Sequence, residues 1–266
     1  MEFLHLIILG LIQGLTEFLP VSSSAHLILL PALVGWDDQG IVYDIAVHAG
    51  SLGAVILYFR KDIQIITKGW LATFSAGSAE KDYLLWYLML ATLPVGLFGL
   101  LLHDFFATSL RGPQVIATAS IVFGLVLWWA DKYGTHARIQ ARISWRDALV
   151  VGFAQALAII PGTSRSGITI TAGLMLGMDR QSASRFSFLL AIPVIILATG
   201  YETYKLSSGH VEIDWVALIS VIALAFVSAW LAIHYFLKLL DRTGMLPYVI
   251  YRVLLGLFLF AIYYSN

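Results

Sequence analysis

The chain has 266 residues, of which 59% are hydrophobic and 12% are charged, and its mean hydropathy is +0.85. Soluble domains carry about 25% charged residues, so a water-soluble globule of this size could not bury so much apolar surface. The composition predicts a polytopic membrane protein and argues against a disordered chain, a nucleic-acid binder and a secreted disulfide scaffold. The formal net charge is zero, and the absence of cysteine excludes disulfides and thiolate-bound metals.

Six segments are long and apolar enough to cross a bilayer core, which needs roughly 20 apolar residues per helix. They are predicted to be full transmembrane helices near 43–59, 83–102, 114–130, 184–204, 214–237 and 248–264. Two other apolar regions, 3–35 and 148–178, are each interrupted by a polar run that contains proline. Because each limb is short for a crossing, we expect two re-entrant hairpins of half-helices. The predicted fold is an all-α integral membrane protein with a single transmembrane domain, 1–266.

The two interrupted regions resemble each other. Gln13 precedes Pro20 and a run of serines, and Gln155 precedes Pro161 and a second group of serines. Three full spans follow each region, and because three is odd, the second copy begins on the opposite side of the membrane. This order predicts an inverted-topology repeat, about 1–131 and 145–266, whose hairpin tips meet inside the bundle. The alternative is two unrelated proline breaks.

The charged residues indicate the orientation of the chain. If each hairpin enters and leaves on one side, segments 60–82, 131–147, 179–183 and 238–247 share a face. That face holds eleven lysines and arginines: Arg60, Lys61, Lys68, Lys81, Lys132, Arg138, Arg142, Arg146, Arg180, Lys238 and Arg242. The opposite face has only Arg111 and Lys205. The positive-inside rule therefore predicts a cytoplasmic first face and both termini outside. If each interrupted region instead crossed the membrane twice, the chain would also return to its starting side, and the same segments would face the cytoplasm.

Polar residues at membrane depth are the candidates for chemistry. Gln13 and Glu17 are four residues apart and share one face of the first half-helix. A carboxylate in this position costs several kcal/mol unless it is paired or hydrated. The alternative to a functional role is a glutamate that a serine or a buried arginine satisfies for stability alone.

Serines open the second half-helix of each predicted hairpin: Ser22, Ser23, Ser24, Ser164 and Ser166. Serine is a good N-cap, so capping alone could explain them. Helix N-termini that point into the bundle also offer free N–H groups and a positive dipole, which together form an anion site. Arg165 adds a cation whose planar fork matches phosphate oxygens. The combination predicts a phosphate site with a metal or proton-transfer partner.

His26 lies one helical turn after Ser23, so the two side chains can share a face. With Glu17 they form a candidate set of nucleophile and general base, although a lone histidine in an apolar helix is usually a hydrogen-bonded core residue. The other histidines lack this context: His48 and His234 have no polar cluster nearby in the sequence, and His103, His136 and His210 fall in predicted loops.

Two further arginines, Arg185 and Arg252, also lie in predicted spans. Each could neutralise a second phosphate, or could pair with a carboxylate such as Glu17, Asp44 or Glu202.

Two long motifs resemble those of a known family. The segment from Gln13 to His26 is similar to the (Glu/Gln)-x-x-x-Glu motif and following Ser-His segment of the bacterial undecaprenyl-diphosphatases, the bacitracin-resistance type. The segment from Pro161 to Thr169 resembles the Pro-Gly-x-Ser-Arg-Ser-x-x-Thr motif of the same family. The resemblance extends over nearly the whole chain, including its length and pattern of spans.

This resemblance implies hydrolysis of undecaprenyl diphosphate to undecaprenyl phosphate and inorganic phosphate. The reaction recycles the lipid carrier for peptidoglycan synthesis and confers bacitracin resistance when the protein is abundant. The resemblance also implies a multi-pass protein of the bacterial inner membrane, a site open to the periplasm, and a divalent cation, Mg²⁺ or Ca²⁺. The expected partners are the lipid substrate, membrane lipids and a second copy in a homodimer, with no nucleic acid.

The family's functional positions map onto this chain residue by residue. Its catalytic positions fall on Glu17, Ser23, His26 and Arg165. Its phosphate-binding positions fall on Ser22, Ser164, Ser166 and Thr169. The metal ligands would be Glu17 and Gln13. Many members have Glu where this chain has Gln13. Because a neutral amide is a poorer metal ligand and cannot act as a base, carboxylate chemistry is assigned to Glu17 alone.

Three routes to phosphoryl transfer remain open at this level. Ser23 or His26 attacks the terminal phosphorus, or His26 activates a water. The competing function is a transporter or lipid flippase, because broken helices in inverted repeats are typical of secondary transporters. An enzyme that also returns the product lipid across the membrane is a third reading.

Overall fold

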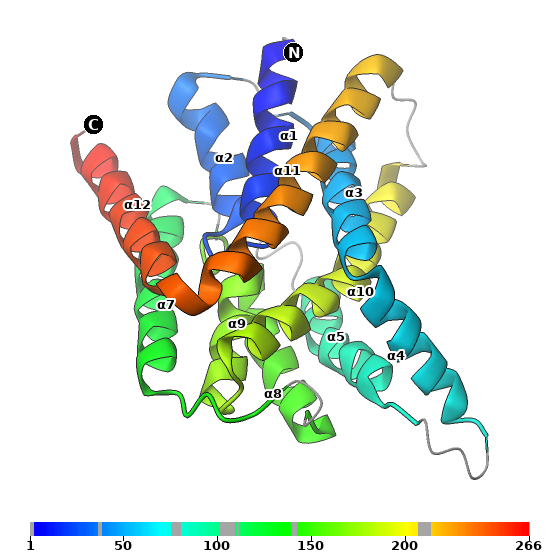
Figure 1. Ribbon diagram of the computed structural model, residues 1–266. Helices are drawn as coiled ribbons and strands as arrows, with labels where there is room; N and C mark the ends of the chain where they lie inside the picture. Colours follow the sequence, from blue (N-terminus) through cyan, green and yellow to red (C-terminus); the bar gives the residue numbers. More distant parts are fainter. Residues whose placement is uncertain are drawn as a thin grey trace.

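The computed structural model describes residues 3–36, 39–75, 81–101, 110, 112–139, 143–206 and 214–265. In this part the chain is helical, with one isolated β-bridge between Arg138 and Met178. The helices are α1 (Phe3–Glu17), α2 (Ser23–Val34), α3 (Ile41–Tyr58), α4 (Arg60–Ala72), α5 (Leu84–Leu101), α7 (Pro113–Tyr133), α8 (Trp145–Ala156), η2 (Leu157–Ile159), α9 (Arg165–Met175), α10 (Arg180–Leu206), α11 (Trp215–Thr243) and α12 (Leu246–Ser265) (Figure 1). The predicted loop positions His103, Arg111, Arg142 and His210 lie outside the described residues.

Six of these helices are long and apolar enough to cross a membrane: α3, α5, α7, α10, α11 and α12. They coincide with the six predicted spans, so the all-α membrane architecture is confirmed at this level. Several run past the predicted bounds. The largest extension is that of α11, which continues to Thr243 and ends where Gly244 adopts a positive φ of 59°, a conformation that glycine tolerates at helix ends.

The two interrupted regions each form two short helices joined by a turn, α1 with α2 and α8 with α9. None of the four exceeds 15 residues. The helix α4 begins at Arg60 immediately after Phe59 and was not predicted from the sequence. Its three cations, Arg60, Lys61 and Lys68, give the segment the composition of a loop, although the helix buries Ile66 and Gly69.

Helix packing interleaves the two halves of the chain. The helix α1 packs against α11, and α8 packs against α5; α3 also packs against α11, and α10 against α5. Close approach depends on glycine, because a Cβ on Gly14 of α1 would lie 1.9 Å from Ser228 Oγ of α11. Likewise, a Cβ on Gly152 of α8 would lie 2.7 Å from the Ala91 carbonyl oxygen of α5. Small residues at such crossings are typical of helix pairs in membranes.

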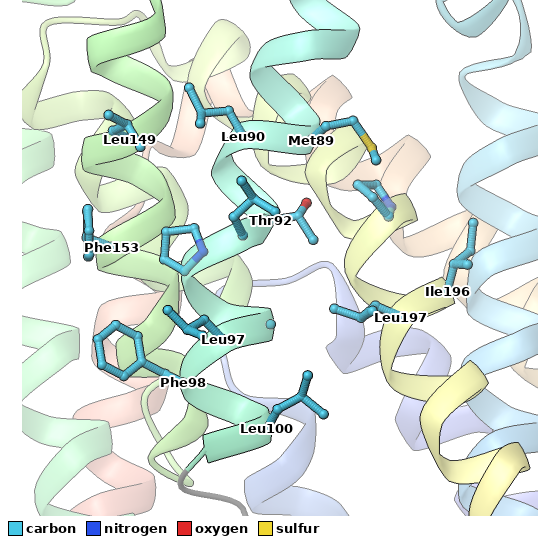
Figure 2. A pocket seen from close by; sticks show the side chains of 14 residues that line it. Met89, Leu90, Thr92, Leu97, Phe98, Leu100, Leu149, Phe153, Ile196 and Leu197 are labelled. Carbon is cyan, nitrogen blue, oxygen red and sulfur yellow. The ribbon is translucent and has the colours of Figure 1, made fainter.

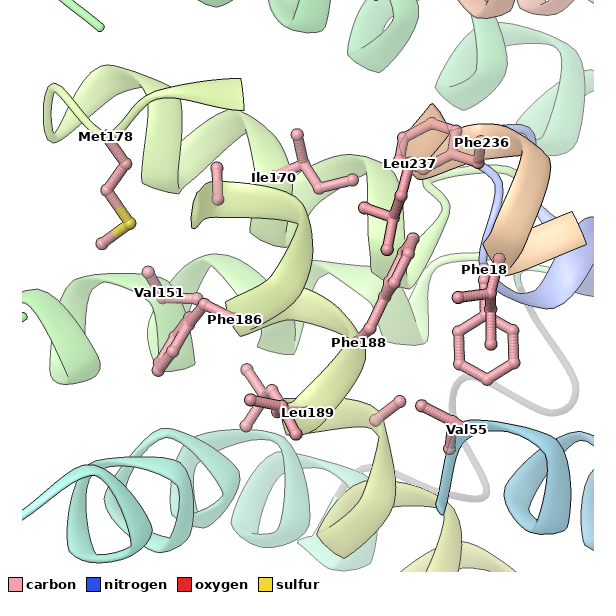
Figure 3. Close-up of a cluster of buried hydrophobic side chains, with 14 of the residues drawn as sticks. Phe18, Val55, Val151, Ile170, Met178, Phe186, Phe188, Leu189, Phe236 and Leu237 are labelled. Carbon is pink, nitrogen blue, oxygen red and sulfur yellow. The ribbon is translucent and has the colours of Figure 1, made fainter. Parts of the chain in front are cut away.

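An aromatic cluster fixes the first turn against the bundle (Figure 3). Phe188 of α10 lies 5.4 Å from Phe18 in the α1–α2 turn, 6.3 Å from Phe59 after α3, and 5.5 Å from Phe236 of α11, measured between ring centroids. All four rings are buried. Edge-to-face and tilted pairs at these distances are favourable, so Phe18, the residue next to Glu17, packs on a ring of α10 that is itself held by two further aromatic rings.

Candidate active site

The turn between α1 and α2 places two candidate residues at adjacent helix ends. Glu17 is the last residue of α1, and Ser23 is the first residue of α2. Between them Ser22 has a φ of 74°, in the left-handed region that side chains other than glycine rarely occupy. Such strained residues persist only where their surroundings hold them, and they cluster at functional sites.

The turn between α8 and α9 has the same local geometry. Ser164 has a φ of 71° immediately before Arg165 opens α9. Its hydroxyl accepts a hydrogen bond from the Gly167 backbone N–H at 3.1 Å, so Ser164 does cap this helix. The Oγ atoms of Ser164 and Ser166 lie 3.3 Å apart, and those of Ser22 and Ser24 lie 3.2 Å apart.

Glu17 joins the two turns. Its Oε1 accepts a hydrogen bond of 2.8 Å from Nη2 of Arg165, and its Oε2 accepts bonds from Gln13 Nε2 at 2.9 Å and from the Ser23 hydroxyl at 2.8 Å. The carboxylate is only 8% exposed, so three donors replace the water that it would otherwise require. A carboxylate at membrane depth requires such close pairing.

The second turn is linked to its neighbours through the remaining polar groups. Ser166 donates to the Leu19 carbonyl at 2.9 Å, which ties the two turns together directly. Arg165 also donates to the Ser187 carbonyl at 3.1 Å. The Thr169 hydroxyl is hydrogen bonded to that of Ser187 at 2.7 Å. The Arg165 guanidinium is therefore held by α1 and α10 at once.

A cavity of about 220 Å³ opens beside these turns. Its polar lining comprises Glu17, Ser22, Ser23, Ser24, His48, Ser164 and Arg165. Five of the nine predicted site residues are in this lining. The other four, Gln13, His26, Ser166 and Thr169, are not: Gln13, Ser166 and Thr169 are buried behind it.

His26 faces away from this cavity toward α12. Its Nδ1 lies 2.7 Å from the Ser22 carbonyl oxygen, and its Nε2 is hydrogen bonded to the Tyr251 hydroxyl. A carbonyl can only accept, so Nδ1 carries the proton and Nε2 accepts from Tyr251. Both ring nitrogens are therefore engaged.

His48 of α3 lines the cavity instead, although the sequence analysis gave it no role. Its Nε2 lies 3.9 Å from Glu17 Oε2, and its Nδ1 lies 2.7 Å from the Asp44 carbonyl oxygen. His48 and Glu17 belong to different helices and are 31 positions apart, so no local pattern could have revealed the pair.

The other two membrane arginines do not pair with any of the three carboxylates considered from the sequence. Arg185 forms an ion pair with Asp62 of α4. Arg252 is fully buried and donates to the carbonyls of Gly162 at 3.0 Å and Thr163 at 2.8 Å, and to Ser120 at 3.2 Å. The alternative of a pair with Glu17, Asp44 or Glu202 is therefore wrong for both, and a role in binding a second phosphate stays a prediction. Arg252 instead fixes the backbone that leads into Ser164.

The residues beside Glu17 fit a hard divalent cation. The Gln13 carbonyl oxygen Oε1 is buried and has no hydrogen-bond partner among the described residues. Rotation of this amide would turn Oε1 toward the carboxylate, and carbonyl and carboxylate oxygens are the ligands that Mg²⁺ and Ca²⁺ prefer. Across the described ranges, no group of three or more His, Cys, Asp or Glu side chains forms a metal cluster, so water or substrate oxygens would have to complete the coordination.

The fold and the cavity define a polytopic membrane protein with an internal polar cavity, lined by Glu17, Arg165 and serines from two turns. The model of the family described as Bacitracin resistance protein BacA matches residues 6–258, and the chain belongs to this family.

Relatives match over nearly their full length. The chain is 52% identical to undecaprenyl-diphosphatase 2 of Stutzerimonas stutzeri, over 99% of both chains. It is also 52% identical to undecaprenyl-diphosphatase 1 of Pseudoalteromonas translucida, over 96% of this chain and 97% of the relative, and to the undecaprenyl-diphosphatase of Teredinibacter turnerae, over 98% and 99%.

Proposed function

We propose that the protein hydrolyses undecaprenyl diphosphate to undecaprenyl phosphate and inorganic phosphate, and so recycles the lipid carrier for peptidoglycan synthesis. Membership of the bacitracin-resistance family supports this reaction, as do the names of the relatives. The observation that carries the proposal is the contact of Glu17 with both Ser23 and Arg165 at the edge of one cavity.

The anion site is built from Arg165 and the start of α9. Arg165 presents a guanidinium that is 13% exposed toward the cavity, beside the helix N-terminus that Ser164 caps. In phosphoryl transfer, catalysis consists largely of positioning and charge stabilisation. A bound diphosphate would accept some of the hydrogen bonds that Arg165 now donates to Glu17. The guanidinium therefore needs no large movement to reach the substrate.

Ser23 is the nucleophile that the geometry favours. Its hydroxyl already donates to Glu17, and it lines the cavity, whereas His26 has both ring nitrogens occupied outside it. The Ser23 Oγ–phosphorus bond forms as the bond from the terminal phosphorus to the bridging oxygen breaks. The Ser23 proton passes to Glu17, undecaprenyl phosphate leaves, and water then hydrolyses the phosphoserine.

A divalent cation, Mg²⁺ or Ca²⁺, would be held by Glu17 and Gln13 and would neutralise phosphate charge when bound. Gln13 also orients the carboxylate through the hydrogen bond from its Nε2 to Oε2. Glu17 therefore has two roles, one toward the serine proton and one toward the cation.

The proposed topology places the two helix pairs as re-entrant hairpins in an inverted repeat within the bacterial inner membrane, with the cavity open to the periplasm. Matched left-handed serines, matched Oγ pairs and the reciprocal packing of α1 on α11 and α8 on α5 support the repeat. The start of α1 and the end of α12 lie toward the same side of the molecule (Figure 1), as both termini outside would require.

Release of phosphate from a long-chain prenyl diphosphate tests the reaction. The purified protein should release phosphate, and EDTA should reduce the rate because it removes the proposed divalent cation. Arg165→Ala should lower kcat/KM by about 10²–10³-fold, because it removes a preorganised charge donor. Arg146→Ala, at an exposed position far from the cavity in sequence and contacts, is the control. A flippase would release no phosphate, and near-normal activity of Arg165→Ala would show that the site is elsewhere.

A further inference from the structure

His48 lines the polar cavity beside Glu17, and the proposed reaction does not use it. Its ring Nδ1 lies 2.7 Å from the carbonyl oxygen of Asp44, one turn earlier on α3. A carbonyl can only accept, so Nδ1 carries the proton, and in the neutral ring Nε2 keeps a lone pair. This second nitrogen is the one that lies 3.9 Å from Oε2 of Glu17.

The two ring nitrogens of His48 have the arrangement of a metal-binding histidine. Such a histidine usually donates its other N–H to a backbone carbonyl or a carboxylate, which fixes both the tautomer and the orientation of the ring. The distance from Nε2 to Glu17 is too long for a hydrogen bond. It suits two ligands of one ion, which lie about 3 to 4 Å apart when each bond to the metal is about 2.1 Å long.

A purely structural ion pair between His48 and Glu17 explains less. The carboxylate already accepts from Arg165 at Oε1, and from Gln13 and Ser23 at Oε2. Arg165 therefore supplies its counter-charge, and hydrogen bonds engage both of its oxygens without His48. The imidazole is not needed to make the buried carboxylate stable.

Gln13 gives an independent indication of a ligand at the same place. Its side chain is fully buried, and its Oε1 has no hydrogen-bond partner among the described residues. Its Nε2 is bonded to Oε2 of Glu17, the oxygen that lies nearer His48. If the amide turned over, two oxygens would face each other, an arrangement that a cation between them would stabilise.

The apolar groove of about 920 Å³ between α5, α8 and α10 shows the contrast with the polar cavity. Figure 2 shows Leu97, Phe98 and Phe153 among the side chains that line this groove. Its one hydroxyl, that of Thr92, donates to a backbone carbonyl of its own helix at 2.8 Å. The groove therefore offers no ligand to a cation, whereas the smaller cavity brings an imidazole beside a carboxylate.

We propose that His48 is a ligand of the divalent cation, together with Glu17 and Gln13, and that its nitrogen makes the site prefer a transition-metal ion such as Zn²⁺ or Co²⁺ to Ca²⁺. Carboxylate and amide oxygens alone suit hard ions, but imidazole suits zinc and its neighbours in the first transition row. This inference rests on the proposed function, which places a cation beside Glu17.

The test is metal binding to the purified protein in detergent after treatment with EDTA, measured by calorimetry with Co²⁺ and with Ca²⁺. Wild type should bind Co²⁺ more tightly. His48→Gln should weaken Co²⁺ binding by about tenfold or more, as the loss of groups that support a metal site does, and should alter the visible absorption of bound Co²⁺. It should retain its affinity for Ca²⁺, which also shows that the variant is folded.

The matched control is His234→Gln on α11. The ring of His234 stacks on Trp230, and this residue is not part of the cavity lining. The variant should bind both ions as wild type does.

The adverse results are distinguishable. Equal affinity of wild type for the two ions, or unchanged Co²⁺ binding and absorption in His48→Gln, would overturn the proposed ligand even in an active phosphatase. An equal loss of both ions in His48→Gln would contradict the selective role of the nitrogen. A wild type that binds Co²⁺ through His48 but releases no phosphate from a prenyl diphosphate would overturn the proposed function and leave the metal site in place.

Discussion

At the scale of single residues, the site depends on which groups are already satisfied by hydrogen bonds. Glu17 accepts from Ser23, Gln13 and Arg165, which gives the serine a proton acceptor and the arginine a counter-charge in one carboxylate. His26, in contrast, has one ring nitrogen hydrogen bonded to the Ser22 carbonyl and the other to the Tyr251 hydroxyl. Its effect on the reaction would therefore be to hold the Ser22 turn in place.

This difference predicts unequal effects of two substitutions. Ser23→Ala should lower kcat by at least about 10³-fold, as expected for loss of a nucleophile, and should abolish any phosphoserine trapped by rapid acid quench and mass spectrometry. Tyr251→Phe, which leaves His26 in place without its hydroxyl partner, should have a far smaller effect on kcat. A phospho-histidine, or full activity of Ser23→Ala, would transfer the nucleophilic role to His26 or to water.

The residues that sequence reasoning found and missed differ in one physical respect. Glu17, Ser23 and Arg165 lie at the helix ends that flank the two turns, which proline and serine mark in the sequence, so their positions could be predicted. The role of His48 depends on a neighbour from another helix, and Arg252 binds backbone carbonyls. Every residue has a backbone carbonyl, so the sequence does not indicate which carbonyls an arginine will bind.

At the scale of elements, hydropathy was sufficient to place the six long helices, and breaks in hydropathy placed the two turns. It failed for α4, because an amphipathic helix with three cations has no long apolar run. The packing partners of each helix also could not be predicted. Contacts such as Gly14 against Ser228 depend on which helices cross, and many glycines in the chain would permit a close approach.

The start of α8 is an element whose stability should depend on pH. Burial raises the pKa of Asp147, but hydrogen bonds from Arg138 and Ser144 outweigh it and hold the pKa of this carboxyl below its ordinary value. Arg138 Nη2 lies 2.6 Å from Asp147 Oδ2, and Arg138 also donates to the Leu176 carbonyl at 2.9 Å. The pair thus joins the start of α8 to the turn before α10.

A carboxyl whose pKa is depressed by folding stabilises the protein above its unfolded pKa, about 4 for aspartate, and this stabilisation is lost as the pH falls through the folded pKa. Asp147→Asn should therefore lower the Tm in detergent at pH 7, and its difference from wild type should shrink as the pH falls below about 4. Asp214→Asn, which keeps a side-chain oxygen to cap α11, is the control. A difference in Tm that is constant with pH would contradict the role of the charge.

At the scale of the whole molecule, three of the four charged segments predicted to share one face, 131–147, 179–183 and 238–247, contact one another. Arg180 donates to Asp131 Oδ1 at 2.6 Å, and the same carboxylate accepts from the Met245 backbone N–H at 3.2 Å. Gln181 donates to Asp241 at 3.1 Å. The ends of α7, α10, α11 and α12 therefore meet at one place. Segments far apart in the sequence can touch here because the topology puts them on the same face of the membrane. In the sequence, only the distribution of positive charge indicated that they share this face.

The orientation of this face can be measured directly, because the chain has no cysteine that would need to be removed. Lys68→Cys lies on the predicted cytoplasmic face and Lys205→Cys on the opposite face, and both positions are exposed. In intact spheroplasts a membrane-impermeant maleimide should label Lys205→Cys and spare Lys68→Cys; after permeabilisation it should label both. Labelling in the reverse order would invert the topology and place the cavity toward the cytoplasm.

The ion pair between Glu17 and Arg165 spans 148 positions of the chain, which has a consequence for biosynthesis. A ribosome adds about 5–20 residues per second, so the acidic partner emerges roughly 7 to 30 s before the basic one. Throughout this interval Glu17 has no Arg165 to pair with, and of its three donors only Gln13 and Ser23 have been synthesised. A chain released before Arg165 is made would therefore keep a carboxylate at membrane depth without its counter-charge, an arrangement that costs free energy in a bilayer.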